Sequence, residues 1–160
     1  MTRPFFLYSF LIMIDTVTPL HDVYQTAREM RRLTVNYWAD LGRWLDEPFL
    51  NFFNYVCALP YRPDPPNVET VSRPAYTLIE GYRPRDCDDK AVLLACWCKG
   101  HAVPVRFVAI STLQNGEPCH VFINAAGVDC DATYPEYHGI LGKYPYYPQI
   151  TNRVNLTNYF

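Results

Sequence analysis

The chain has 160 residues, enough for one domain with a hydrophobic core and too few for two ordinary domains. Hydrophobic residues make up 49% of the chain and charged residues 19%, which is typical of a folded protein and excludes an intrinsically disordered one. The formal net charge of −2 lacks the basic excess of proteins that neutralise phosphates, so we expect no binding to nucleic acid. We predict a single domain over residues 1–160.

The N-terminal segment, residues 1–20, contains an apolar run from Pro4 to Ile14. Its 11 residues fall short of the roughly 18–20 that a membrane-spanning helix needs. No small-residue cleavage site follows the run, although a signal peptide requires one. A buried strand, or a start of translation at Met13, explains the run better. We therefore expect neither a membrane span nor a signal peptide.

The next part of the chain predicts helices. His21–Leu33 has apolar residues at helical spacing. Tyr37–Cys57 continues with an aromatic face, and Pro48 is expected either to separate two helices or to break one. The five prolines from Pro60 to Pro74 then predict an extended, ordered loop.

Asp86–Lys99 is the clearest predicted helix, with Asp86 as its N-cap and Lys99 followed by glycine at its end. The tail from Tyr134 is rich in proline and tyrosine and is expected to wrap the surface. Helices followed by strands predict an α+β fold, in which N-terminal helices pack on an antiparallel sheet. The three expected strands are Val103–Ser111, Cys119–Asn124 and Val128–Thr133.

The six cysteines contain no CxxC pair, so neither a zinc ribbon nor a thioredoxin-type site is expected. Four or five of the six are predicted to be reduced thiols, most of them buried. The cysteines assigned to packing are Cys96, Cys98, Cys119 and Cys130.

Cys87 stands out because a thiol nucleophile needs a lowered pKa, a base within reach and a group that orients the base. As the first residue of its helix, Cys87 would feel the positive end of the helix dipole, which favours the thiolate. Its backbone N–H could also hold an oxyanion. His120 and Asp131 follow on neighbouring predicted strands, where they can face one another. The sequence Ala-Ala-Gly at 125–127 is more typical of a three-residue turn with Gly127 in the left-handed conformation, which would shift the register by one residue. The facing therefore requires either an even-numbered loop, such as Ala125-Ala126, or a bulge after Gly127.

The stretch Arg85-Asp86-Cys87-Asp88-Asp89-Lys90-Ala91, together with the later Gly100-His101, Pro104 and Arg106-Phe107-Val108, resembles the core motif of the transglutaminase-like superfamily. The segments 119–123 and 128–133 resemble its His strand and its Asp-x-Thr strand. Residues 61–65 and 74–78 are similar to small transglutaminase-like proteins encoded by tailed bacteriophages and prophages. The resemblance covers about residues 52–148.

The resemblance implies a papain-like core with the nucleophile at a helix N-terminus. It implies Cys87 as nucleophile, His120 as base and acid, and Asp131 as the orienting group, without a cofactor or a metal. The implied substrates are amides of peptides, proteins or peptidoglycan, and phage structural proteins are possible partners. The implied location is the bacterial host cytoplasm or the virion.

The chain departs from the family pattern at Arg85, where glycine is usual, and this arginine is expected to crowd or charge the cleft. The side chain that completes the oxyanion hole is not identified by the motif. The candidates beside the Cys87 backbone are Asn54, Tyr55 and Tyr61.

Several alternatives stay open at the level of sequence. The acyl group could pass to water, giving a protease or amidase, or to an amine, giving a transamidase; a small domain without calcium-site signatures favours hydrolysis. The rival function is a catalytically inactive structural or binding component of a phage tail or virion. Asp86, Asp88 and Asp89 could suggest calcium, but the glycine and later glutamate of an EF-hand loop are missing. A solvated first helical turn is predicted instead.

Overall fold

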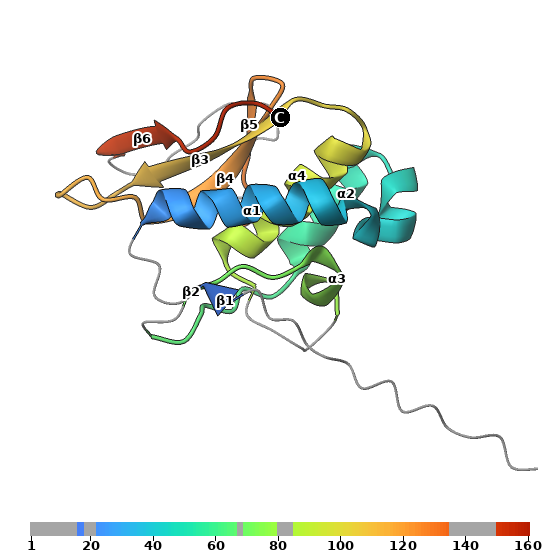
Figure 1. The fold of residues 1–160 in the computed structure, drawn as a ribbon, viewed down its shortest axis with the longest axis horizontal. Coiled ribbons are helices and arrows are strands. Elements are labelled where there is room, and N and C mark those ends of the chain that lie inside the picture. The colour runs from blue at the N-terminus through green and yellow to red at the C-terminus, as the bar shows by residue number, and fades with distance from the viewer. Residues whose placement is uncertain (1–15, 18–21, 67–68, 80–84, 135–149) are drawn as a thin grey trace, which may run out of the picture.

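The computed structural model describes residues 16–17, 22–66, 69–79, 85–134 and 150–160 (Figure 1). N-terminal helices pack against a four-stranded antiparallel sheet, which confirms the predicted α+β class. No helix in these described ranges is long and apolar enough to cross a membrane. The apolar run Pro4–Ile14 lies outside the described residues.

Helix α1 spans Val23–Tyr37 and extends four residues beyond its predicted end. Its N-cap is Asp22, whose side chain accepts a hydrogen bond of 2.8 Å from the backbone N–H of Tyr24. The buried face of α1 carries Ala27, Met30 and Leu33 at helical spacing, as the sequence indicates.

The aromatic segment after α1 is divided at Pro48, as predicted. The part before this proline, Trp38–Asp46, is a 3₁₀ segment (η1) with a kink at Gly42, which has a positive φ of 53°. Helix α2, Phe49–Ala58, begins directly after Pro48 because the proline fixes its own φ and needs no hydrogen-bond donor at a helix start. Trp44 of η1 stacks on Tyr55 of α2, with ring centroids 4.1 Å apart.

The proline-rich region is not wholly a loop. Strand β2, Glu69–Thr70, pairs with β1, Thr16–Val17, in a separate two-stranded sheet. Pro74 begins the short helix α3, Pro74–Thr77, because proline suits the first position of a helix. Strand β2 lies within the predicted loop and α3 begins at its last residue, and neither element was predicted.

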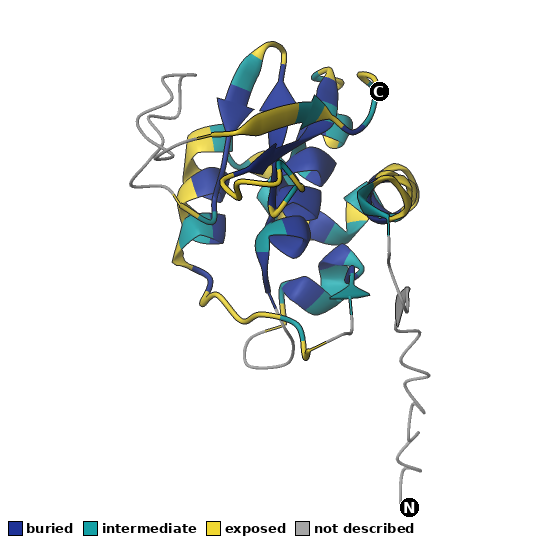
Figure 2. Cartoon of the chain, turned by 90° about the vertical axis from the view of Figure 1, so that its left-hand side faces the viewer, coloured by how far each residue is buried: buried dark blue, intermediate teal, exposed yellow. Residues whose placement is uncertain are grey.

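Helix α4, Cys87–Gly100, is the centre of the fold and packs against the other helices and the sheet. Nine consecutive residues, Asp88–Cys96, are buried, which explains why α4 lacks a polar face (Figure 2). The core is formed mainly by α4, α1, α2 and the inner face of the sheet. The N-terminus of α4 is therefore held from several sides.

The sheet has the order β5-β4-β3-β6, with every neighbouring pair antiparallel. Three strands match predicted ones within a few residues, while β6 in the C-terminal tail was not predicted. The strands are β3 Val105–Ser111, β4 His120–Ala125, β5 Val128–Cys130 and β6 Asn152–Asn155. The described end of the tail, residues 150–160, is thus tied to the sheet through β6, while the rest of the predicted surface wrap, residues 135–149, lies outside the described residues.

The turn between β4 and β5 consists of Ala126 and Gly127, both with positive φ, 48° and 90°. Two positive values are typical of the tight turn that suits the twist of a hairpin. The three-residue turn that Ala-Ala-Gly favours is therefore wrong, because Ala126 also adopts a positive φ and Ala125 stays in β4. The loop is even-numbered, as one of the two predicted alternatives required, although it lies one residue later than Ala125-Ala126. Strand β5 then pairs regularly with β4, so no bulge is needed for His120 and Asp131 to lie on the same face of the sheet.

Candidate active site

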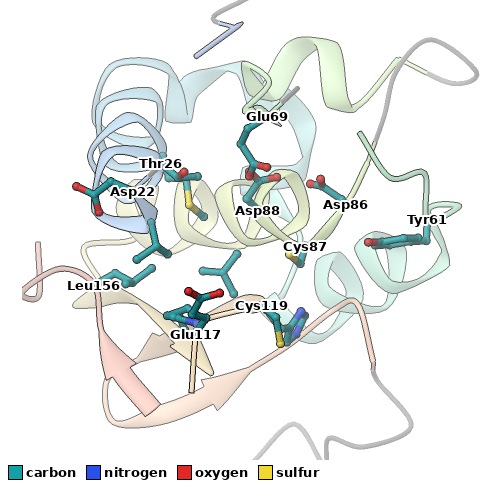
Figure 3. A pocket seen from close by; sticks show the side chains of 16 residues that line it. Asp22, Thr26, Tyr61, Glu69, Asp86, Cys87, Asp88, Glu117, Cys119 and Leu156 are labelled. Atoms are coloured by element: carbon teal, nitrogen blue, oxygen red, sulfur yellow. The ribbon is translucent and has the colours of Figure 1, made fainter. Parts of the chain in front are cut away.

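Cys87 lies at the first position of α4 and borders a cavity of about 600 Å³ (Figure 3). We call this space the Cys87 cavity. Its lining comes from α1 and its N-cap, the segment after α2, β2, the start of α4, β3, the β3–β4 connection, β4 and the residue after β6. The lining residues are Asp22, Val23, Thr26, Met30, Tyr61, Glu69, Asp86, Cys87, Asp88, Ala109, Glu117, Pro118, Cys119, His120, Val121 and Leu156.

His120 also lines the Cys87 cavity, and its Nε2 atom donates to Oδ2 of Asp131. Both side chains are buried, with 9% and 1% of their residue surface exposed. Ile123 pairs with Cys130, so continuing this register sets Asp131 opposite Phe122 rather than opposite His120. The two groups are therefore diagonal neighbours on one face of the sheet, a distance that a histidine side chain spans.

Asp131 is held in place by its own backbone surroundings. Its Oδ1 atom accepts hydrogen bonds from the backbone N–H groups of Thr133, at 2.7 Å, and Tyr134, at 3.3 Å. Lys90, three residues after Cys87 on α4, donates to the carbonyl oxygen of Ala132 at 3.3 Å. The helix that carries the thiol and the turn that carries the carboxylate are thus joined by a buried ammonium group.

The environment of the Cys87 thiol differs from the prediction of a helix-stabilised thiolate. Desolvation by burial, followed by the charge of Asp86, raises the pKa of Cys87 well above its usual value. A backbone hydrogen bond from Val121, the residue after His120, opposes this rise. This environment disfavours the thiolate, although the partly buried Cys87 borders the cavity, so a base is needed to make the thiol a nucleophile.

The three oxyanion-hole candidates lie in different places. Tyr61 is half-exposed and lines the Cys87 cavity; partial desolvation, together with the nearby Asp86, raises the pKa of Tyr61 to about 12, so its hydroxyl stays a hydrogen-bond donor. Asn54 is exposed and Tyr55 stacks on Trp44, and neither borders the cavity. Tyr61 is the candidate that the structure places with Cys87.

Arg85 neither crowds nor charges the cleft, so that prediction is wrong. The residue is 1% exposed, and its guanidinium donates to the backbone carbonyls of Thr77, at 2.7 Å, and Ile79. Its backbone forms an antiparallel bridge with Arg62. Arg85 therefore anchors the segment before α4 to the end of α3.

The predicted solvated turn of aspartates is also wrong. Asp86, Asp88 and Asp89 are 8%, 1% and 0% exposed. Asp86 occupies the N-cap position, but its side chain makes no capping hydrogen bond. Burial, together with the neighbouring carboxylates, raises the pKa of both Asp88 and Asp89 well above the usual range. Sequence reasoning missed this burial because charged residues in a first helical turn are usually exposed.

All six cysteines are free thiols. Burial raises the pKa of Cys98 and Cys130 to about 12, and that of Cys96 further, as expected of inert packing residues. Cys119 was assigned to packing as well, but it is exposed and borders the Cys87 cavity. It therefore competes with Cys87 in any labelling experiment.

No protein-family model matches the chain, and neither the curated proteins nor the solved structures contain one that is detectably similar to it. Any assignment of function therefore rests on the residues and the geometry described above.

Proposed function

We propose that this protein is a transglutaminase-like cysteine enzyme that transfers acyl groups from amide bonds through a thioester, with water as the usual acceptor. The observation that carries the proposal is the hydrogen-bonded pair of His120 and Asp131 in the cavity that Cys87 borders at the start of α4. A papain-like core is supported by the order of these residues along the chain: the thiol on a helix, the imidazole on a strand and the carboxylate directly after the next strand.

The chemistry follows from this arrangement. Nδ1 of His120 takes the proton from the Cys87 thiol, and the sulfur attacks the carbonyl carbon of the amide. Asp131 stabilises the imidazolium that forms, while the Cys87 backbone N–H and the Tyr61 hydroxyl donate to the oxyanion. The carbon–nitrogen bond breaks as His120 gives its proton to the leaving amine, which leaves a thioester. Water, deprotonated by His120, then releases the acid and restores the thiol.

The expected substrates are amides of peptides, proteins or peptidoglycan, and the sequence resemblance favours a phage or prophage origin. Such a protein would act in the host cytoplasm or as part of the virion, where phage structural proteins are candidate partners.

A second function is favoured by a specific observation. Because burial and Asp86 keep the Cys87 thiol neutral, a chain that has lost turnover could retain this arrangement as a structural or binding component of a phage tail or virion. The two functions differ in one property, which is the ability of His120 to activate the thiol.

The test is acylation by p-nitrophenyl acetate, which needs no knowledge of the natural substrate. We expect a burst of one p-nitrophenol per chain, and a peptide map that places the acetyl group on Cys87. Adding a primary amine to the acylated protein then measures the partition between hydrolysis and transamidation, and we expect water to remain the main acceptor.

Cys119→Ser is the matched background, because it removes the exposed thiol at the cavity rim without touching His120 or Asp131. Cys87→Ala in that background should fold and lose the burst. If the burst is absent from a folded Cys119→Ser chain, or maps to other residues, the enzyme proposal fails and the structural function is preferred.

A further inference from the structure

Lys90 is a buried lysine that takes no part in the steps of the proposed reaction. It lies on α4, three residues after Cys87, so the two residues share one side of the helix. Only 3% of Lys90 is exposed, although lysine is rarely buried to this degree. Burial lowers the pKa of Lys90, while the nearby Cys57 and Asp131 oppose that fall. The fold therefore keeps an ammonium group where a charge is costly.

Stability alone does not explain this lysine. Replacing buried charged groups with apolar side chains of similar size is often neutral or stabilising. A methionine at position 90 would have a similar length and no charge to desolvate. An apolar side chain cannot donate hydrogen bonds, however, so the role of Lys90 follows from its acceptors.

The Lys90 ammonium group has two printed acceptors in the described part of the chain, and both are backbone carbonyls of segments that carry residues of the site. Nζ donates to the carbonyl oxygen of Ala132 at 3.3 Å and to that of Cys57 at 3.4 Å. Ala132 directly follows Asp131, whose carboxylate accepts from His120. The first bond therefore fixes the Asp131 turn relative to the helix that carries Cys87.

The second bond fixes the end of α2. Cys57 lies in the last turn of α2, where carbonyl groups lack helical partners and the helix dipole favours a cation. Tyr61 follows four residues later. The next residue, Arg62, exchanges two backbone hydrogen bonds of 3.3 and 2.9 Å with Arg85, just before α4. The segment that carries Tyr61 is thus attached on both sides, by Lys90 before it and by Arg85 after it.

We propose that Lys90 is a positioning residue, whose ammonium group holds the Asp131 turn and the end of α2 in place so that His120 and Tyr61 meet the Cys87 thiol in a reactive geometry. This role rests on the proposed function, because it concerns the same site. Without the ammonium group, the Asp131 turn loses its link to α4 and no longer keeps the His120 ring in one tautomer. A misplacement of about 1 Å can slow a reaction by about 10²-fold.

The experiment compares three variants in the Cys119→Ser background. Lys90→Met removes the charge and the donors but keeps the length of the side chain, whereas Lys90→Arg keeps both the charge and the donors. Lys99→Met is the matched control, because Lys99 lies in the last turn of the same helix and does not border the Cys87 cavity. Thermal melting checks that each variant is folded. If Lys90→Met does not fold, Lys90→Gln takes its place with the same expected results.

Acylation of Cys87 by p-nitrophenyl acetate should slow by about 10–100-fold in Lys90→Met. Lys90→Arg should recover part of that rate, and Lys99→Met should react as the background does. In ¹⁵N spectra of the His120 ring, the background should carry its proton on Nε2, and Lys90→Met should show a mixture of the two tautomers. A lysine that only stabilised the fold would leave this tautomer unchanged.

Two results would overturn the proposal: a folded Lys90→Met that acylates at the background rate, or a Lys99→Met that slows as much as Lys90→Met does. The tautomer measurement needs no turnover and so separates this inference from the enzymatic one. Mixed tautomers in Lys90→Met, with no acylation of the Cys119→Ser chain, would reject the proposed function alone. Normal acylation and an unchanged tautomer in Lys90→Met would reject the role of Lys90 alone.

Discussion

Replacing Asp131 with asparagine keeps the size of the side chain and changes one interaction. The new Oδ1 can still accept from the backbone N–H groups of Thr133 and Tyr134, while the amide nitrogen replaces the oxygen that now accepts from His120. An amide N–H facing Nε2 makes that nitrogen an acceptor, so the proton of the neutral imidazole moves to Nδ1. Nδ1 can then no longer take the Cys87 proton.

The expected effect on reactivity is large and the effect on stability is modest. General base catalysis contributes about 10²–10⁴-fold, so acylation of Cys87 by p-nitrophenyl acetate should slow by that factor. Exchanging a hydrogen bond to a charged carboxylate for one to a neutral amide costs at most the roughly 1.5–3 kcal/mol that the charged hydrogen bond contributes. For a domain of this size that loss lowers the melting temperature by roughly 3–10 °C.

The matched control is Asp129→Asn. Asp129 lies on the same sheet face, accepts hydrogen bonds from Asn124 and Arg153, and does not border the Cys87 cavity. It should lose comparable stability while its acylation rate stays within twofold of the wild type. The reasoning is refuted if Asp131→Asn acylates at the wild-type rate, or if Asp129→Asn slows as much as Asp131→Asn does.

Three further outcomes are expected. In His120→Ala, the rate at which iodoacetamide alkylates Cys87 should rise about tenfold per pH unit up to at least pH 9, because the raised pKa of Cys87 keeps its thiolate scarce below that pH. A rate that levels off near neutral pH would contradict this. Arg85→Ala removes a fully buried side chain and leaves two backbone carbonyls without their donor, so the free energy of unfolding, measured by thermal melting, should fall by about 2–5 kcal/mol. An unchanged melting temperature would mean that Arg85 does not anchor its segment. Gly127→Ala should lower the free energy of unfolding by about 1–2 kcal/mol in the same assay, because a φ of 90° is strained for alanine while the added methyl group meets no neighbouring atom. An unchanged stability would argue against the Ala126-Gly127 turn.

Local patterns in the sequence were enough for much of the fold. The helical spacing of α1, the break at Pro48 and the helix that begins at Cys87 follow from side-chain periodicity and proline geometry, which act over a few residues. The turn is an exception: the glycine at 127 favoured a three-residue loop, whereas the chain forms the two-residue turn Ala126-Gly127, in which Ala126 also has a positive φ. Because side chains alternate between the two faces of a strand, the register of β4 and β5 then places Asp131 on the same face of the sheet as His120.

Other features depend on which segments meet in space. Strand β6 exists because β3 offers it a free edge, and four residues with no alternating pattern give no local signal. The same holds for Arg85, whose partners are backbone carbonyls 8 and 6 residues away. Only packing decides whether such a side chain turns toward a cleft or into the protein.

The state of the site was decided by burial. A helix N-terminus and three aspartates predict a thiolate above a solvated turn, but α4 enters the core at its first turn and carries Asp88 and Asp89 with it. Desolvation, together with the charge of Asp86, then raises the pKa of Cys87 and disfavours its thiolate. The sequence by itself determined which residues are available for chemistry, whereas the tertiary structure decided their charge, because the cost of a charge depends on how much water the fold leaves around it.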